Sequence, residues 1–204
     1  MMRLVGPWFS GPTRRVGITL KLLGVPFEHL AFHAYLQRDM VEVHSPMGKV
    51  PALLLDDGRT LFNSWNMIDY LHELAGPQRA LLPQAGVLRQ EALNHVGTAE
   101  AIYGKLSSLY DESLRPEAAR VPSLIERWTE QVRVGLNMLE AAAGQGWLVG
   151  GTLSQADIFT VIVYESASRG LLPNEVHGDA YPRLQALMER AFRLAAFSET
   201  SPFA

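Results

Sequence analysis

The chain of 204 residues contains no cysteine. Disulfide bonds, cysteine-ligated zinc and a cysteine nucleophile are therefore excluded, and any thiol chemistry must use a thiol that a ligand brings. Basic residues are not in excess, because 18 Lys and Arg stand against 21 Asp and Glu, so we expect no nucleic-acid partner. No apolar run approaches the roughly 18 residues of a membrane span, and no signal-peptide pattern opens the chain. We therefore expect a cytoplasmic protein with no membrane partner.

The first part of the chain has the pattern of a small α/β domain. Apolar runs at 2–6, 27–32, 52–55 and 59–62 predict strands, and a helix is predicted between the first two strands. A helical crossover makes its flanking strands parallel, whereas the Asp57-Gly58 turn predicts an antiparallel hairpin. The sequence therefore predicts a mixed sheet of about four strands with helices on its faces.

The pattern changes after the breakers Pro83 and Gly86. Apolar residues then recur at steps of three and four, which predicts long amphipathic helices near 88–110 and 124–139. Ser154 to Asp157 has the spacing of a capping box, which opens another helix. The sequence thus predicts an α/β domain over residues 1–78 and an all-helical domain over residues 86–204.

A single hydroxyl, Ser10, stands immediately before the first helix, and Pro12 suits that helix's first turn. A helix N-terminus offers unpaired backbone N–H groups and the positive end of a dipole, so it favours an anion. Ser10 either caps the helix or also faces a bound anion. The same two alternatives apply to Asn63-Ser64, which begins the third helix of this domain.

In their order and spacing, these features resemble those of the cytosolic glutathione transferase family, of the serine type and bacterial-like. The resemblance covers essentially the whole chain and depends on Ser10 with Arg15-Val16, Gly48-Lys49-Val50-Pro51-Ala52-Leu53, Asp57-Gly58 leading to Asn63-Ser64, and Leu153-Ser154-Gln155-Ala156-Asp157-Ile158. It implies a thioredoxin-like N-terminal domain, an all-α C-terminal domain, a role in detoxification and a homodimer.

The resemblance also implies glutathione as co-substrate, with no metal. Ser10 would donate a hydrogen bond to the glutathione thiolate, and Val50, in a cis-proline turn, would pair its backbone with the cysteinyl part. Ser64 would bind the γ-glutamyl carboxylate. The implied glutathione-binding residues are Lys49, Val50, Pro51, Asn63 and Ser64. Asn63 departs from the family, which usually has Glu or Gln and sometimes Asp there. Asn is shorter than Gln and carries no charge, so we expect it to weaken glutathione binding or to change how glutathione is oriented.

Candidate residues for the electrophile come from both domains. Trp8 and Phe9 precede Ser10 and either reach an electrophile pocket or pack under the second domain. Tyr103, Ser107 and Tyr110 recur on one stripe of the first long helix, where they either line the pocket between the domains or belong to the helical core. His29 and His33 are four apart in an extended segment, so we predict no metal site there.

We expect a glutathione transferase that directs the thiolate to a small apolar electrophile. One alternative is a glutathione-dependent isomerase, dehalogenase, ether-cleaving enzyme or peroxidase on the same fold. Phe9-Ser10-Gly11 differs from the Ser-Ser-Cys that zeta-class isomerases typically show. The other alternative is a non-catalytic ligand-binding or assembly module, because a fold does not fix a function.

Overall fold

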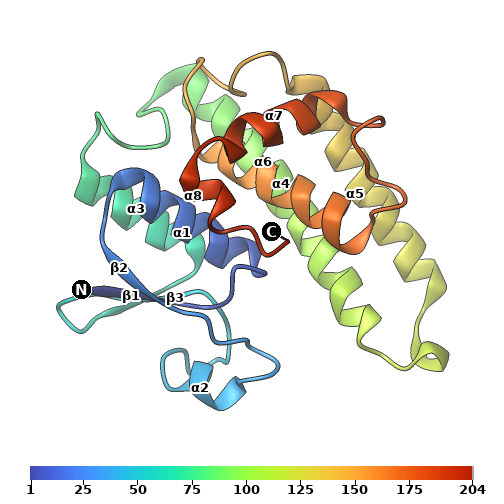
Figure 1. Cartoon of the computed structure of the whole chain (residues 1–204), viewed down its shortest axis with the longest axis horizontal. Helices are drawn as coiled ribbons and strands as arrows, with labels where there is room; N and C mark the ends of the chain where they lie inside the picture. Colours follow the sequence, from blue (N-terminus) through green and yellow to red (C-terminus); the bar gives the residue numbers. More distant parts are fainter. Residues whose placement is uncertain (204) are drawn as a thin grey trace. The chain divides into compact units, whose positions relative to one another are not determined.

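The computed structural model describes residues 1–203, which form two compact units (Figure 1). The first unit comprises Met1–Leu81 and Phe192–Pro202, and the second comprises Leu82–Ala191 and Phe203. The segment 192–202 falls within the range that the sequence assigns to the helical domain. By its contacts this segment belongs to the first unit.

The first unit contains a four-stranded sheet in the order β2-β1-β3-β4. Its strands are β1 (Met2–Val5), β2 (Phe27–Leu30), β3 (Ala52–Leu54) and β4 (Thr60–Phe62). β1 runs parallel to β2 and antiparallel to β3, and β3 and β4 form an antiparallel hairpin. The mixed sheet predicted from the crossover helix and the Asp57-Gly58 turn is therefore confirmed.

Three helices complete the order of this unit up to residue 81: α1 (Gly11–Leu23), α2 (Arg38–Glu42) and α3 (Ser64–Ala75). Figure 1 shows α1 and α3 together on one face of the sheet and α2 on its other side. Apolar side chains between the helices and the sheet make the core, among them Leu4, Val16, Leu20, Leu53, Met67 and Leu71. This packing fixes where the first turns of α1 and α3 lie.

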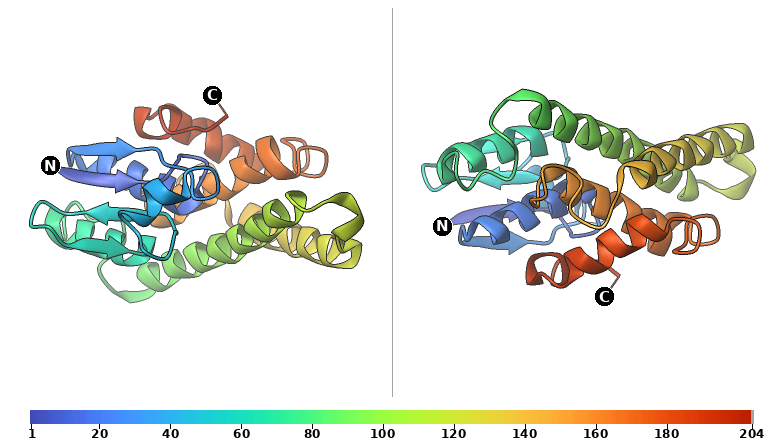
Figure 2. Two further views of the ribbon diagram at one scale, coloured as in Figure 1. Left: turned by 90° about the horizontal axis from the view of Figure 1, so that it is seen from below. Right: turned by 90° about the horizontal axis from the view of Figure 1, so that it is seen from above.

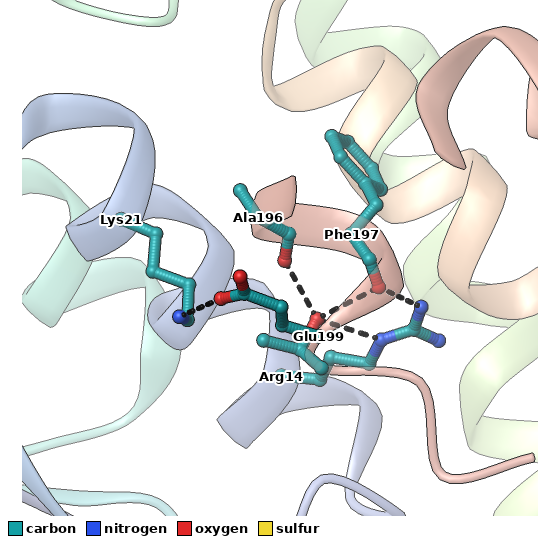
Figure 3. A network of polar contacts seen from close by, with 6 residues as sticks. Arg14, Lys21, Ala196, Phe197 and Glu199 are labelled. Atoms are coloured by element: carbon teal, nitrogen blue, oxygen red, sulfur yellow. Dashed lines mark hydrogen bonds and ion pairs between the residues drawn. The ribbon is translucent and has the colours of Figure 1, made fainter. Parts of the chain in front are cut away.

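A short C-terminal helix, α8 (Ala195–Ser198), packs against α1 in the first unit (Figure 3). The buried Arg14 of α1 donates from Nε to the Thr200 hydroxyl oxygen at 3.3 Å. Two helical turns after Arg14, Lys21 pairs with the same segment, because its Nζ lies 2.6 Å from a carboxylate oxygen of Glu199. The end of the chain thus braces the helix that follows Ser10.

The second unit is helical. Its helices are α4 (Gly86–Ser113), α5 (Pro122–Ala142), α6 (Gln155–Glu165) and α7 (Pro182–Phe192), with a 3₁₀ turn at Glu117–Ala119 and a π-helical turn at Ser166–Leu171. α4 and α5 run side by side (Figure 2), and every residue of α6 is buried. The predicted all-α part is confirmed. Within residues 1–203, no helix is both long and apolar enough to cross a bilayer.

The predicted capping box at the start of α6 is present. Asp157 accepts hydrogen bonds from the backbone N–H of Ser154 at 2.9 Å and from its hydroxyl at 3.0 Å. Its other oxygen accepts from the N–H of Leu148 at 2.7 Å, so the carboxylate also ties the preceding loop to the helix. Burial raises the pKa of Asp157, and these hydrogen bonds oppose the rise. The sequence predicted the capping role, but not the contact with Leu148.

Candidate functional site

Ser10 is the N-cap of α1, and its side chain is only partly buried. Its Oγ accepts a long hydrogen bond, 3.4 Å, from the backbone N–H of Thr13. A hydroxyl that accepts through a lone pair still has its own O–H to donate. Capping and donation to a ligand are therefore compatible, and one side chain can do both.

The turn before β3 lies directly against the first turn of α1. The Val50–Pro51 peptide bond is cis, as the resemblance implies. Gly6 lies between this turn and α1 in very tight packing. A Cβ on Gly6 would lie 2.8 Å from Val50 Cβ and 2.5 Å from Thr13 Oγ1. Only glycine allows this approach. Lys49, the residue before the turn, is exposed.

α3 begins with the other predicted pair. Asn63 is the N-cap, and its Oδ1 accepts from the N–H of Trp65 at 2.9 Å. Within residues 1–203 it is the only non-glycine residue with a positive φ, 69°, a region that Asn tolerates better than most residues. Ser64, the first helical residue, is buried. Because the amide oxygen of Asn63 caps the helix, its NH₂ group is the end with which it can meet a ligand.

One contact holds the two helix starts together. The guanidinium carbon of Arg15, in α1, lies 4.5 Å from the ring centroid of Trp65, in the first turn of α3. Arg15 is fully buried, so the contact is desolvated and favourable for a cation over an aromatic face. The N-terminal ends of α1 and α3 consequently lie at the same end of the unit, beside the Val50–Pro51 turn. Two positive dipole ends at one place favour an anionic ligand.

Trp8 packs inside the first unit. Its ring stacks on His29 of β2 with centroids 3.6 Å apart and planes 16° apart. It also packs closely against Gly17 of α1, where a Cβ would lie 2.4 Å from Trp8 Cζ3. Phe9, by contrast, is 39% exposed beside Ser10. The indole therefore supports the segment that carries Ser10.

Replacing Gly17 by alanine should destabilise the protein by about 1–3 kcal/mol, because the new methyl group must displace the Trp8 ring from a packed position. Urea unfolding followed by circular dichroism measures the change. Gly97 of α4 is the matched control, since a Cβ there meets nothing within 4 Å. Gly97→Ala should stabilise by about 0.5–1 kcal/mol through helix propensity. Equal effects of the two variants would contradict the tight packing at Gly17.

Tyr103, Ser107 and Tyr110 all lie on α4, in the second unit, and are partly buried. The Tyr103 ring contacts Phe159 of α6 with centroids 6.1 Å apart. Their place in an electrophile pocket stays a prediction.

Of the residues predicted in the first unit, the structure brings together Ser10, the Val50–Pro51 turn and the pair Asn63-Ser64, through Gly6 and the contact of Arg15 with Trp65. Lys49 precedes the turn and is exposed, Phe9 is exposed beside Ser10, and Trp8 packs on His29.

Sequence reasoning missed Trp65 and the contact of His29 with Trp8. The contact of Arg15 with Trp65 and that of Trp8 with His29 each join residues far apart in the chain, and the spacing of His29 from His33 gave no indication of Trp8. A Trp in the first turn of a capped helix was the only signal available for Trp65. No group of three or more His, Asp or Glu side chains among residues 1–203 is arranged to hold a metal ion.

Two family models match the chain. The N-terminal domain of glutathione S-transferase matches residues 9–74, and the C-terminal domain of glutathione S-transferase matches residues 99–195. An uncharacterized GST-like protein of Escherichia coli K12 is 27% identical, over 98% of both chains. A maleylacetoacetate isomerase of Pseudomonas aeruginosa is 30% identical, over 98% of this chain and 96% of the relative.

Among solved structures, a glutathione S-transferase of Methylobacterium radiotolerans in complex with glutathione sulfonate superposes with a TM-score of 0.91. It is 26% identical, and the match covers 100% of this chain and 95% of that one. The two matched domains lie in the two units of the fold, and the relatives and the solved structure match over nearly the whole chain.

Proposed function

Because the chain belongs to the glutathione S-transferase family, we propose that it binds glutathione where α1, α3 and the Val50–Pro51 turn meet, and activates its thiol. The observation that carries the proposal is the convergence of two hydroxyl-bearing helix starts, Ser10 and Ser64, held by Arg15 and Trp65. Glutathione carries carboxylates and a thiol that ionises, so it suits an end of the unit that favours negative charge.

Ser10 has the central chemical task in this proposal. A free thiol has a pKa of about 8.5 and is mostly protonated at neutral pH. A hydroxyl donor and the dipole of α1 both favour the thiolate and therefore lower that pKa. Ser10 is no nucleophile itself, because no base among the predicted site residues adjoins it. Glutathione supplies the nucleophilic sulfur when bound, and we propose a small apolar electrophile as its target.

The remaining predicted residues would hold the rest of the ligand. We propose that Ser64 receives the γ-glutamyl carboxylate at the start of α3, where backbone N–H groups are also available. Val50 would pair its backbone with the cysteinyl part, and the exposed Lys49 would approach the glycyl carboxylate. Asn63 would meet the γ-glutamyl group with its NH₂ end, since its oxygen caps α3.

The test of this function is direct. The protein should be retained on immobilised glutathione, and bound glutathione should show thiolate ultraviolet absorbance at a lower pH than free glutathione. Conjugation to a generic chlorinated aromatic should consume glutathione. Failure of binding and of conjugation together would favour a non-catalytic module instead.

Replacing Ser64 by alanine should raise the Kd for glutathione about tenfold, because a charge-assisted hydrogen bond to the carboxylate is lost. The turnover at saturating glutathione should change little, since the thiol lies at the other helix. Isothermal titration calorimetry and steady-state kinetics separate the two effects. Ser123→Ala, at an exposed serine in the first turn of α5, is the matched control and should leave the Kd unchanged. A fall in turnover with an unchanged Kd would contradict the assignment.

A glutathione-dependent cis–trans isomerase is the second candidate, favoured by the 30% identity to a maleylacetoacetate isomerase. Such a reaction needs the same stabilised thiolate, for reversible addition to a conjugated double bond and elimination after rotation. Conjugation consumes glutathione, whereas isomerisation returns it. Assays on maleylacetoacetate and on a chlorinated aromatic, each with glutathione measured before and after, therefore separate the candidates. Phe9-Ser10-Gly11 in place of Ser-Ser-Cys is the sequence feature that favours the transferase.

A further inference from the structure

The segment from Gly6 to Ser10, which joins β1 to α1, is held by one side chain from the neighbouring strand. His29 lies in β2, opposite Leu4 in the parallel register. Its Nε2 is 2.7 Å from the carbonyl oxygen of Gly6, and its ring stacks on Trp8 with centroids 3.6 Å apart. A single imidazole thus fixes both the backbone and the large side chain of this segment.

Further contacts transmit this hold to Ser10. The N–H of Gly6 donates to the carbonyl of Leu30 at 2.9 Å, and the N–H of Ser10 donates to the carbonyl of Pro7 at 3.0 Å. Trp8 is confined by Gly17 of α1, where no Cβ would fit. Contacts therefore hold the segment at Gly6, at Trp8 and at Ser10, and His29 contributes those at Gly6 and Trp8.

The hydrogen bond from His29 to Gly6 does not depend on the protonation state of the imidazole. The pKa of His29 lies below its ordinary value, because burial and the nearby charge of Lys21 lower it more than the hydrogen bond to the Gly6 carbonyl raises it. Because a carbonyl oxygen only accepts, Nε2 must carry the proton. The imidazolium keeps that N–H, so the hydrogen bond to Gly6 survives protonation. His29 contacts Gly6 and Trp8, so we place its effect on Ser10 in the segment that carries these two residues.

We propose that His29 is a positioning residue for thiol activation: through the Gly6 carbonyl and the Trp8 indole it fixes where the Ser10 hydroxyl stands at the start of α1. The proposal rests on the function proposed above. It adds a residue of β2, 19 positions from Ser10 in the sequence, to those that set the pKa of the bound thiol.

Three substitutions separate the two contacts of His29, the hydrogen bond to the Gly6 carbonyl and the stacking on Trp8. His29→Phe keeps a ring that can stack on Trp8 but has no N–H for Gly6, and His29→Gln keeps a donor but no ring. His29→Leu keeps neither. We expect His29→Leu to lower the turnover about tenfold, because a displaced donor stabilises the thiolate poorly. The ultraviolet titration of bound glutathione should shift to higher pH, and the KM for glutathione should stay unchanged. His29→Phe and His29→Gln should each recover part of the loss.

A second readout needs no ligand. Amide hydrogen exchange at Ser10, followed by NMR, should accelerate about tenfold in His29→Leu, because the segment then opens more readily. His177→Leu, at an exposed histidine of the second unit, is the control and should change neither readout. If His29→Leu does not fold, His29→Gln supplies both measurements.

The outcomes separate this proposal from the function on which it rests. If Ser10→Ala shifts the thiol titration but His29→Leu and His29→Gln leave it and the Ser10 exchange unchanged, only the role of His29 is overturned. If the wild-type protein binds no glutathione, both proposals are overturned. A shift in titration and exchange with an unchanged KM supports both.

Discussion

Replacing Ser10 by alanine is expected to lower kcat/KM for conjugation about 10- to 150-fold. A hydrogen bond to a charged group contributes about 1.5–3 kcal/mol, and each 1.36 kcal/mol of lost transition-state stabilisation is about tenfold in rate. Because the thiolate loses its donor, the pKa of bound glutathione should rise by about one to two units. Ultraviolet titration of the bound thiol measures this rise, and stopped-flow conjugation measures the rate.

Ser10 also caps α1, since its Oγ accepts from the N–H of Thr13. Further variants are therefore needed to separate this capping from the hydrogen bond that the hydroxyl donates to the thiolate. Ser10→Asp keeps a capping acceptor but has no O–H and adds a negative charge beside the thiolate, so it should be at least as inactive as alanine. Ser10→Thr keeps both functions. Binding of S-methylglutathione, which has no thiol, should be nearly equal in the wild type, Ser10→Ala and Ser10→Thr. An unchanged thiol titration in Ser10→Ala would show that the hydroxyl only caps α1.

Ser154→Ala provides the matched cap control. Ser154 is the N-cap of α6, in the second unit, and accepts from the N–H of Ala156 at 3.2 Å. Its loss should lower stability by about 1 kcal/mol or more, as for other caps, with no change in the bound-thiol titration. A rise in the thiol pKa in this variant would mean that the titration reports general loosening of the protein.

Replacing Asp157 by alanine is expected to give the largest loss of stability, about 3 kcal/mol or more. Its carboxylate accepts from Leu148 N–H, Ser154 N–H and the Ser154 hydroxyl, and each buried donor left without a partner costs about 1–3 kcal/mol. The Tm should fall by about 6–12 °C in a chain of this size. Asp179→Ala, at an exposed aspartate of the same unit, should change stability by less than about 0.5 kcal/mol.

The ionisation of Asp157 should make the free energy of unfolding depend on pH in a defined direction. Burial raises its pKa above the ordinary 3.8, so the folded state favours the protonated form. The protonated carboxyl therefore contributes to the stability of the fold. That contribution is complete below pH 3.8 and is lost as the pH rises through the folded-state pKa of Asp157. The advantage of the wild type over Asp157→Asn should therefore be larger at about pH 4 than at about pH 7. Urea unfolding at both values measures it, and the opposite order would mean that the hydrogen bonds outweigh burial.

The elements of the fold were predictable because each depends on local chemistry. The crossover helix dictated parallel strands, Asp57-Gly58 dictated a hairpin, and Ser154 with Asp157 marked the start of α6. The cis bond before Pro51 came from the family resemblance, since spacing alone does not select it.

The support of the site was not predictable in the same way. His29 reaches Trp8 because β1 and β2 pair in one register, and Arg15 reaches Trp65 because α1 packs on α3. Such contacts depend on how elements pack, and no spacing in a single sequence encodes them. The packing of Trp8 against Gly17 likewise follows from the close approach of a loop to a helix.

The bracing of α1 by the chain's last helix has a consequence for the order of synthesis. Arg14, four positions after Ser10, donates to the carbonyl of Phe197 at 3.3 Å. Its partner is therefore synthesised only near the end of translation. Until Phe197 and Thr200 have been made, the guanidinium of Arg14 lacks two of the acceptors that it has in the finished protein, where it is buried. The unit that carries Ser10 is therefore not a contiguous stretch, and a ribosome that has released residues 1–81 has not yet supplied all of it.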